Sequence, residues 1–372
     1  MKEEVLVIVD SICNGGIEKV VYNIAKFCCE EITFHIYVIN QKDMYYATAL
    51  KECGCIIVNE SHNQITIRSR FHLFSSVNMY LSRNTQIKCI HIHSANHAPE
   101  CLLAAWVRKL PVRCIHSHNA YSTYWNPGLF SFKVRLCSLL FKYINNLLST
   151  HRIACSKAAA ITSFGKQSTY SVIFNGIDLD YFSPSSHPAK EELQRKYGLK
   201  ESDDNFIFVG RFAEQKNCIF MLRVIAHILK TQNNIHLSIV GYGELEKDIK
   251  DTIIQLGLQS YVKFFPHHSN IPELLKASDY FISPSLHEGL GLVFVEAQLM
   301  GLNAFASDQV PTEADIGLCH FVPLSLKVPG YAEYVKKVIT SKTSHIENRT
   351  NKARAYDMAK IAEIYKKIYK QV

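Results

Sequence analysis

The sequence predicts an α/β protein with two doubly wound, Rossmann-like domains, and three observations lead to this prediction. Short apolar runs alternate with amphipathic segments in both halves, at spacings of roughly 20–30 residues that suit βαβ units and parallel sheets. A chain of 372 residues is too long for one ordinary hydrophobic core and fits two domains. Turn-forming residues interrupt the alternation at 175–188, where one domain is expected to end and the next to begin.

The first half contains apolar runs that are typical of strands buried on both faces of a parallel sheet. We expect strands at Val5–Val9, Phe34–Ile39, Ile87–His93, Val112–His116, Arg152–Cys155 and Ser171–Phe174. The amphipathic segments between them predict helices, for example over Glu18–Cys29 and Pro99–Lys109.

The second half alternates in the same way and ends in a long amphipathic segment. We expect strands at Phe206–Val209, His236–Val240, Val262–Phe265, Tyr280–Ser283 and Ala304–Ala306. Leu292–Met300 is typical of a helix, which Gly301 ends. The final segment, Ala355–Tyr369, predicts a helix that returns to the first domain, with apolar residues at Met358, Ile361, Ile364 and Ile368. The predicted parts are therefore residues 1–178, residues 179–352 and the returning helix in 353–372.

The composition excludes several classes of protein. Hydrophobic residues at 48% and charged residues at 20% are typical of a folded globular chain and exclude a disordered one. The apolar runs fall far short of the about 18–20 residues that span a bilayer, and the N-terminus lacks the pattern of a signal peptide. The 12 cysteines include no Cys-x-x-Cys, so we expect reduced thiols in the cytoplasm.

The net charge of +8 belongs entirely to the first half. Residues 1–175 hold 18 Lys and Arg against 10 Asp and Glu, whereas residues 176–372 hold 23 of each sign. From Cys101 to Ile177 there are nine basic residues and no acidic one, and within this stretch Asn126–Thr150 mixes apolar with basic residues. A basic surface attracts anionic partners, but no nucleic-acid-binding motif accompanies this one, so nucleic acid is not the expected partner.

Glycines follow the first strand, in the segment Asn14-Gly-Gly-Ile-Glu18. Because they lack side chains, Gly15 and Gly16 let backbone amides and a helix N-terminus approach an anionic ligand, although such glycines can also simply form the turn. The segment is not Gly-x-Gly-x-x-Gly, and no acidic residue closes the next strand. Both facts argue against a nicotinamide cofactor.

The corresponding turn of the second half carries two cations. Arg211 and Lys216 follow the strand Phe206–Val209, at the end where α/β sheets bind ligands. Two cations beside a helix N-terminus suit a diphosphate, because Arg can bridge two oxygens. The alternative is a pair of solvated surface charges.

The most informative segment of the second half contains two glutamates among glycines. Glu288 lies in a loop after a strand, beside Gly289 and Gly291, and Glu296 follows eight residues later in the predicted helix. We expect the carboxylate in the helix to accept hydrogen bonds from the hydroxyls of a ribose, and the carboxylate in the loop to accept hydrogen bonds from the hydroxyls of a sugar. The helix dipole alone favours one acidic residue near a helix N-terminus, but it does not explain this combination.

Histidines gather near strand ends, at His91, His93, His97, His116 and His118. Residues two apart on a strand place both rings on one face, which leaves a metal site open. No Asp, Glu or Cys stands beside them at ligand spacing, so the sequence predicts no metal.

Together these segments closely resemble the retaining glycosyltransferases of family four, and most closely the capsule, exopolysaccharide and O-antigen enzymes of bacteria. The matching motifs occur in the same order along nearly the whole chain: Gly15-Gly-Ile-Glu-Lys19, His116-Ser-His-Asn119, Ala154-Cys-Ser-Lys157, Asn175-Gly-Ile-Asp178, Gly210-Arg-Phe-x-Glu-Gln-Lys-Asn217, Gly241-Tyr-Gly-Glu244 and Glu288-x7-Glu296. The resemblance implies the GT-B fold, in which two Rossmann-like domains face each other across a cleft that binds a nucleotide sugar. Asn303 stands where Pro is common, and this departure touches no chemistry.

The resemblance also implies roles for individual residues. Arg211 and Lys216 match the diphosphate-binding pair, Glu296 the glutamate that holds the ribose, and Glu288 the one that faces the donor sugar. His118 or His116 matches the active-site histidine, and we favour His118. Acceptor-side candidates are His93, His116 and Asn119. Further donor contacts are implied for Gly15, Gly16, Gly210, Gly241, Pro266, His267 and the backbone of Gly289, Leu290, Gly291, Leu292 and Val293.

The implied activity is the retaining transfer of a hexose or N-acetylhexosamine from a nucleotide sugar, with UDP as the expected carrier, to a growing lipid-linked surface polysaccharide. Arg211, Lys216 and a helix N-terminus can stabilise the leaving diphosphate, and no Asp-x-Asp motif is present, so we expect no metal or other cofactor. A lipid-linked acceptor is met at the anionic cytoplasmic leaflet. We therefore expect a cytoplasmic protein that binds the inner face of the plasma membrane through its basic first domain.

Other functions compete with this interpretation. A nucleotide-sugar epimerase shares the GT-B fold but should lack the two glutamates eight residues apart. A dinucleotide oxidoreductase needs the glycine fingerprint that is missing here, and a binding module without activity would have lost the cations or the glutamates. A soluble acceptor is the alternative to a lipid-linked one.

Overall fold

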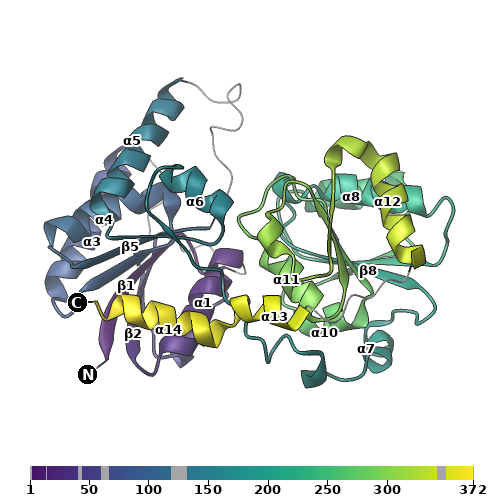
Figure 1. The fold of residues 1–372 in the computed structure, drawn as a ribbon, viewed down its shortest axis with the longest axis horizontal. Coiled ribbons are helices and arrows are strands. Elements are labelled where there is room, and N and C mark those ends of the chain that lie inside the picture. Colours follow the sequence, from purple (N-terminus) through teal and green to yellow (C-terminus); the bar gives the residue numbers. More distant parts are fainter. Residues whose placement is uncertain are drawn as a thin grey trace. The chain divides into compact units, whose positions relative to one another are not determined.

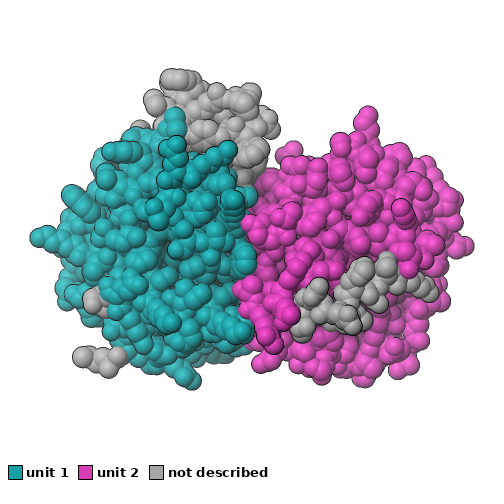
Figure 2. Space-filling model, in the orientation of Figure 1, with its two compact units in different colours: residues 1–176, 357–372 teal, residues 177–356 magenta. Residues whose placement is uncertain are grey.

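The computed structural model describes residues 2–13, 15–40, 44–59, 67–118, 132–341 and 349–371. The chain divides into two units, which Figure 2 distinguishes by colour. Unit 1 comprises Met1–Gly176 and Asp357–Val372, and unit 2 comprises Ile177–Tyr356. The sequence analysis placed the corresponding boundaries at residues 178 and 352.

Unit 1 is built around a seven-stranded parallel sheet with the order β3-β2-β1-β4-β5-β6-β7. Its strands are β1 (Glu3–Val9), β2 (Ile32–Val38), β3 (Ile56–Asn59), β4 (Cys89–Ile92), β5 (Val112–Ser117), β6 (His151–Ala154) and β7 (Ser171–Val172). Its helices are α1 (Gly16–Cys28), α2 (Ala47–Glu52), α3 (Ile67–Arg83), α4 (Ala98–Val107), α5 (Phe132–Leu148), α6 (Lys157–Phe164) and α14 (Met358–Tyr369). The sequence analysis missed β3, a short edge strand whose first residue, Ile56, is exposed and so gives a weak apolar signal.

Unit 2 is built around a six-stranded parallel sheet with the order β10-β9-β8-β11-β12-β13. Its strands are β8 (Asp204–Val209), β9 (Ile235–Val240), β10 (Val262–Phe265), β11 (Tyr280–Ser283), β12 (Asn303–Ser307) and β13 (Cys319–Val322). Its helices are α7 (Lys190–Tyr197), α8 (Cys218–Ile228), α9 (Glu246–Gln255), α10 (Ile271–Ala277), α11 (Leu292–Leu299), α12 (Lys327–Ser341) and α13 (Arg349–Ala353). The missed strand here is β13, an edge strand of mixed polarity that is only partly buried.

Both sheets are doubly wound, with helices on both faces (Figure 1). The apolar core of unit 1 begins with Val5–Val9 of β1, which are all buried, as expected for a strand covered on both faces. The strand order reverses between β1 and β4 in unit 1 and between β8 and β11 in unit 2. Ligands of such sheets bind beyond the carboxyl ends of the strands near this reversal.

The last helix, α14, belongs to unit 1, where it packs against α1. Asp357 caps its N-terminus, because the side chain accepts a hydrogen bond from the amide of Ala359 at 3.0 Å. Its buried residues follow helical periodicity: Met358, Ile361, Ala362, Tyr365, Ile368 and Tyr369. Ile364, which was named with the apolar residues of this segment, lies beside the buried stripe and is 45% exposed.

Two further observations concern thiols and membranes. Each cysteine that the structure describes is a free thiol, and most of these thiols are buried. Among the described helices we find none that combines the length and the apolar character needed to cross a bilayer.

Candidate functional site

The predicted donor-binding residues of unit 2 follow the carboxyl ends of four neighbouring strands. The sheet places β10, β9, β8 and β11 side by side. The loops that follow these strands carry, in the same order, Pro266 with His267, Gly241, Arg211 with Lys216, and Glu288. Because parallel strands end at one edge of the sheet, residues far apart in sequence gather along this edge.

Hydrogen bonds join the loop after β8 to the loop after β11. The amide of Leu286 donates to the carbonyl of Gln215 at 2.8 Å, and the Gln215 side chain donates to the carbonyl of His287 at 2.9 Å. The Asn217 side chain donates to the carbonyl of Pro284 at 3.2 Å. These three bonds fix the residues next to Lys216 against the residues next to Glu288.

Lys216 and Glu288 form an ion pair at the centre of these loops. Lys216 Nζ lies 2.5 Å from Glu288 Oε1, and the hydroxyl of Ser285 donates to the same oxygen at 2.8 Å. Both side chains are largely buried, so each charge needs the other as a partner. The sequence assigned these residues to different parts of a ligand and did not predict their contact. Arg211, the other predicted cation, is exposed to solvent.

The backbone between Glu288 and α11 adopts a conformation that favours glycine. Gly291 precedes α11 with φ +80° and ψ 60°, in the left-handed region. A Cβ at this position would lie 2.8 Å from a ring carbon of Phe294. The chain thereby turns directly into α11, whose first amides have no partner within the helix and are suited to an anion.

The structure buries the side chains of two other predicted donor residues. Glu296 lies in the second turn of α11 and is 3% exposed, and Leu290 is 1% exposed. Leu290 therefore offers a ligand only its backbone, as the resemblance implied. The side chain of Glu296 lies in the interior of unit 2 and not on its surface.

The loop after β9 packs its glycines onto the loop after β8. A Cβ on Gly241 would lie 2.0 Å from the carbonyl oxygen of Gly210, and one on Gly243 would lie 2.5 Å from that of Phe212. The amide of Phe212 donates to the carbonyl of Tyr242 at 2.7 Å. The sequence analysis implied a donor contact for Gly241 and missed this packing role. The ring of Tyr242 also lies 4.6 Å from that of His267, measured between centroids.

In unit 1, the predicted anion-binding turn already holds a carboxylate. Gly15 precedes α1, and Glu18 in the first turn accepts hydrogen bonds from Ser11 Oγ at 2.7 Å and Cys13 Sγ at 3.4 Å. An acidic residue here is favoured by the helix dipole. Gly16 has open space around it among the described residues, since none of their atoms outside its own chain neighbours and helix backbone lies within 4 Å of the position of a Cβ. Gly16 is thus the accessible residue of this turn.

The predicted histidines of unit 1 form one cluster, which we call the histidine cluster: His91, His93, His116 and His118. His91 and His116 lie on the adjacent strands β4 and β5, and His93 and His118 follow the ends of these strands. His93 Nδ1 and His118 Nε2 share a hydrogen bond of 2.7 Å. The ring centroids of neighbouring members lie 3.9–5.4 Å apart.

Helix α14 supplies two partners to this cluster that the sequence analysis missed. The hydroxyl of Tyr369 lies 2.7 Å from His91 Nδ1, and that of Tyr365 lies 3.5 Å from His116 Nδ1. Both tyrosines are fully buried. Their spacing of one helical turn along the periodic segment was the signal that could have found them.

The members of the histidine cluster differ in how far their side chains are exposed to solvent. His93 and His116 are buried, whereas His118 is partly exposed and is thus the member that a ligand can reach. Burial lowers the pKa of His91 to about 3 and holds the pKa values of His93 and His116 well below the usual range. These rings are therefore neutral at pH 7. Asn119, the third acceptor-side candidate, lies outside the described residues.

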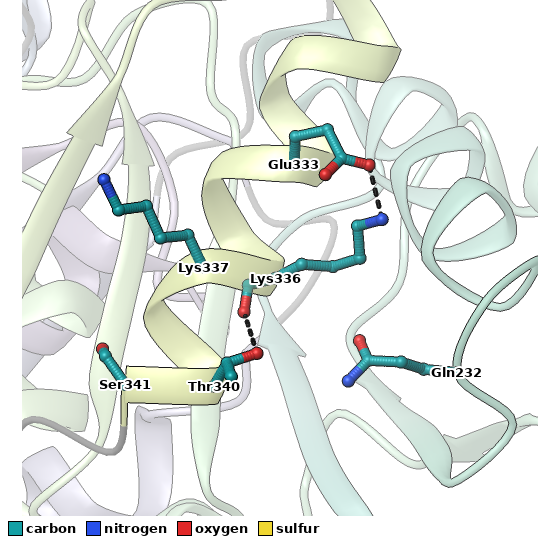
Figure 3. Close-up of a pocket in the computed structure, with 6 residues that line it drawn as sticks. All are labelled: Gln232, Glu333, Lys336, Lys337, Thr340 and Ser341. Carbon is teal, nitrogen blue, oxygen red and sulfur yellow. Dashed lines mark hydrogen bonds and ion pairs between the residues drawn. The ribbon is translucent and has the colours of Figure 1, made fainter.

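A separate hollow of about 480 Å³ lies on unit 2 beside α12 (Figure 3). Its lining is formed by Gln232, Glu333, Lys336, Lys337, Thr340 and Ser341. Lys336 pairs with Glu333 of the same helix. None of the residues predicted for the donor or the acceptor lines this hollow.

Two family models match the chain, one in each half. Residues 14–181 match the model described as Glycosyltransferase Family 4, and residues 189–355 match the model described as Glycosyl transferases group 1. The two matches together contain every motif on which the resemblance rested.

The chain is also similar to named proteins. It is 34% identical to EpsF of Bacillus subtilis (strain 168) over 253 aligned residues. The alignment covers 67% of this chain and 65% of EpsF. It is 30% identical over 250 residues to the Escherichia coli UDP-Gal:alpha-D-GlcNAc-diphosphoundecaprenol alpha-1,3-galactosyltransferase, covering 63% of this chain and 61% of that enzyme. The aligned region thus spans just under two thirds of each relative. The fold is that of Anabaena HepE, solved with UDP and glucose: the TM-score is 0.80 at 19% identity, and both chains are covered completely.

Proposed function

Because this chain belongs to the GT-B glycosyltransferases of family four, we propose that it transfers a hexose or N-acetylhexosamine from a nucleotide sugar to a growing surface polysaccharide. The configuration at the anomeric carbon is retained in this proposal. The observation that carries it is the pairing of Lys216 with Glu288 beside the N-terminus of α11, at the ligand-binding end of the unit 2 sheet.

In the proposed reaction, the bond between the anomeric carbon and the diphosphate oxygen breaks as the oxygen of an acceptor hydroxyl forms the new glycosidic bond, and the hydroxyl proton passes to the departing diphosphate. Negative charge develops on the leaving diphosphate, and preorganised positive groups stabilise it. Lys216, Arg211 and the amides at the start of α11 are these groups, so no metal ion is needed at the diphosphate. Arrival of the donor would draw Lys216 toward the diphosphate and release Glu288 to accept a sugar hydroxyl.

The departing and entering oxygens use the same face of the sugar in this proposal. A double displacement would need a carboxylate nucleophile close to the anomeric carbon. Glu288 is the carboxylate assigned to the sugar, and its oxygen Oε1 already has two partners, Lys216 and Ser285. An oxocarbenium-like transition state that is attacked from the leaving-group side requires no such nucleophile.

The proposed donor is a UDP-sugar. The name of the Escherichia coli relative specifies UDP-Gal, and the Anabaena protein was solved with UDP and glucose. The rings of Tyr242 and His267 lie next to each other after β9 and β10, with their planes inclined by 49°, and each ring offers an aromatic face on which a base can stack. Which sugar is carried is left to the experiment.

Thermal denaturation with a panel of nucleotide sugars tests this donor assignment. A ligand at 100 times its dissociation constant adds about 2.7 kcal/mol to the free energy of unfolding. We expect the melting temperature to rise with one or a few UDP-sugars, and we expect UDP release to accelerate when acceptor is added. Conversion of the UDP-sugar into its epimer, without UDP release, would instead show an epimerase. No shift with any nucleotide sugar would contradict the proposal.

We further propose that the acceptor is lipid-linked and that unit 1 binds the anionic membrane that carries it. Helix α5 exposes Leu140, Tyr143 and Leu147, which are 53%, 66% and 65% exposed and lie on one face at helical spacing. Neighbouring α4 exposes Trp106 and Val107. Aromatic and aliphatic side chains beside basic residues are suited to the interface of an anionic membrane.

Contacts within unit 1 decide which lysines can take part in this binding. Lys142 Nζ donates to the carbonyls of Ile161 and Thr162 in α6, at 3.3 and 3.1 Å. Lys142 therefore joins α5 to α6, and charge reversal there would disturb unit 1 itself. The side chains of Lys133 and Arg135 lie outside the described ones.

The membrane test therefore uses the apolar face. We expect the double variant Leu140→Gln/Tyr143→Gln to sediment less with anionic vesicles than the wild type does, with an unchanged melting temperature. Neutralising Lys133 and Arg135 to Gln should weaken binding by roughly fivefold per residue, since each basic residue near the surface contributes about 1 kcal/mol. Lys337→Glu on unit 2 is the control. Equal failure of the wild type to bind anionic and neutral vesicles at low salt, with transfer intact, would indicate a soluble acceptor.

A further inference from the structure

We propose that the histidine cluster of unit 1 binds a divalent first-row metal ion, with zinc as the ion it suits best, through His91, His93 and His116. This inference concerns a site separate from the donor residues of unit 2 and does not depend on the proposed transfer. The sequence analysis expected no metal because it found no acidic or cysteine ligands at the usual spacing. The fold supplies imidazoles from two strands instead.

The three ligand atoms are already close together. One ring nitrogen from each of His91, His93 and His116 lies within 4.8 Å of those of the other two. Nitrogens bound to a tetrahedral zinc ion at 2.0–2.1 Å are about 3.3 Å from one another. Each nitrogen therefore has to move by about 1 Å, and the parallel rings of His91 and His116 also have to turn so that both lone pairs point at one ion. In the described part of the chain no fourth ligand atom joins this group, so water would complete the tetrahedron, as it does in open three-ligand zinc sites.

Each of the three histidines has a partner on its Nδ1 atom, which leaves Nε2 for an ion. Tyr369 lies on His91 Nδ1, Tyr365 on His116 Nδ1 and His118 on His93 Nδ1. A tyrosine hydroxyl oxygen can accept the Nδ1–H bond, and this tautomer keeps the Nε2 lone pair free. Histidines that bind metals typically donate their second ring nitrogen in this way, and the partner fixes the ring.

Two of these Nε2 atoms lack any other partner. His91 Nε2 and His116 Nε2 are buried and accept or donate no hydrogen bond among the described residues. A buried polar atom without a partner costs roughly 1–3 kcal/mol, and a metal ion would remove this cost for both atoms.

A single buried water is the competing explanation, because it could also satisfy two ring nitrogens. Water does not require three converging imidazoles, whereas imidazole is a preferred ligand of zinc, copper and nickel. A bound ion would also hold His93, whose Nδ1 contacts the more exposed His118. Loss of the ion would then release His93 and, through this contact, disturb the orientation of His118.

The experiment measures zinc in the full chain by mass spectrometry after exposure to excess zinc and gel filtration. We expect about one zinc per chain in the wild type, and less than about a tenth of this in His91→Gln and His116→Gln. The matched control is His151→Gln, a partly exposed histidine of the same unit that lies outside the ligand group. It should keep the full amount.

Cobalt gives a readout that does not depend on the variants. Cobalt added to the wild-type chain should produce the intense visible absorption of a tetrahedral site, and zinc should abolish it. The wild-type melting temperature should rise with zinc, because an ion that binds only the folded state stabilises it. Less than about a tenth of a zinc per wild-type chain, or no tetrahedral cobalt spectrum, would overturn the proposal. Equal zinc content in the wild type and both cluster variants would also overturn it.

Discussion

Both units gather polar side chains near the carboxyl ends of their strands, but these side chains are charged in unit 2 and neutral in unit 1. In unit 2, Lys216 and Glu288 are an ion pair on loops that also contact each other through backbone groups. In unit 1, the histidine cluster is held by Tyr365 and Tyr369 of a helix from the end of the chain. Its buried rings are neutral, because burial lowers their pKa values.

From this difference we expect changes in the unit 2 loops to affect turnover and changes in the unit 1 cluster to affect stability. The unit 2 loops present charges that a diphosphate and a sugar can take over, so changes there should reduce turnover. The unit 1 cluster joins β4 and β5 to α14, so changes there should first reduce the stability of unit 1. Each of the following variants tests one side of this contrast.

The largest effect is expected for the two cations of unit 2. Arg211→Ala and Lys216→Ala should each lower turnover by about 100- to 1000-fold, which corresponds to about 2.7–4 kcal/mol of lost transition-state stabilisation. The measurement is the rate of UDP release with saturating donor and acceptor. Arg223→Ala, which removes another exposed arginine of unit 2, should leave the rate unchanged.

The ion pair requires a further control, because Lys216→Ala leaves the buried carboxylate of Glu288 without its counter-charge. The double variant Lys216→Ala/Glu288→Gln removes both charges. It should recover much of the melting temperature that Lys216→Ala loses, while its turnover stays low. Near-normal turnover in both single variants would contradict the diphosphate assignment.

The next effect concerns the backbone that leads into α11. Gly291 (φ +80°) and Gly257 (φ +67°) both occupy the left-handed region. A Cβ on Gly291 would lie 2.8 Å from a ring carbon of Phe294, whereas a Cβ on Gly257 would meet no such neighbour among the described residues. Gly257→Ala should lower the free energy of unfolding by about 1–2 kcal/mol, through the backbone alone. Gly291→Ala should cost roughly a further 1–3 kcal/mol from overpacking. Urea denaturation of both variants measures the difference, and equal losses would mean that the loop adapts freely.

The sequence predicted the unit 2 site better than the unit 1 site for a physical reason. The unit 2 residues carry charges and follow strands of one predicted parallel sheet, whose carboxyl ends lie at the same edge, so the strand pattern indicated that Arg211, Lys216 and Glu288 share this edge. What it could not predict was the direct bond between Lys216 and Glu288, because side-chain pairing depends on the exact loop geometry.

In unit 1, the strand positions of His91 and His116 were predicted, but their environment was not. The contacts with Tyr369 and Tyr365 join residues separated by 278 and 249 positions. Such contacts depend on where α14 returns, which periodicity does not specify. Periodicity predicted the existence of α14 but not that its apolar residue Ile364 is exposed.

A smaller effect is expected where α14 meets the histidine cluster. Tyr369→Phe removes the hydroxyl that lies 2.7 Å from His91 Nδ1 and leaves that buried nitrogen without a partner. The loss should lower the free energy of unfolding by about 1–3 kcal/mol. Tyr143→Phe, at a site that is 66% exposed, is the control and should change stability very little. The affinity for a UDP-sugar should not change in either variant, and a large loss of donor affinity in Tyr369→Phe would break the proposed separation between the units.

The smallest effect is expected at the surface of unit 1, where Glu31 pairs with Lys366 of α14 and with Lys370, which directly follows this helix. Hydrogen bonds from Lys366 and then Lys370 lower the pKa of Glu31 to about 2. A carboxylate whose pKa is lower in the folded chain than in the unfolded one stabilises the fold above its unfolded pKa, and this contribution disappears as the pH falls through the folded value. Glu31→Gln should therefore melt slightly below the wild type from about pH 5 upward, and the two curves should converge as the pH falls toward 2. High salt should shrink the difference at pH 7, since the pair is exposed to solvent. A difference that persists at low pH and in high salt would mean that packing, and not charge, attaches this end of α14 to unit 1.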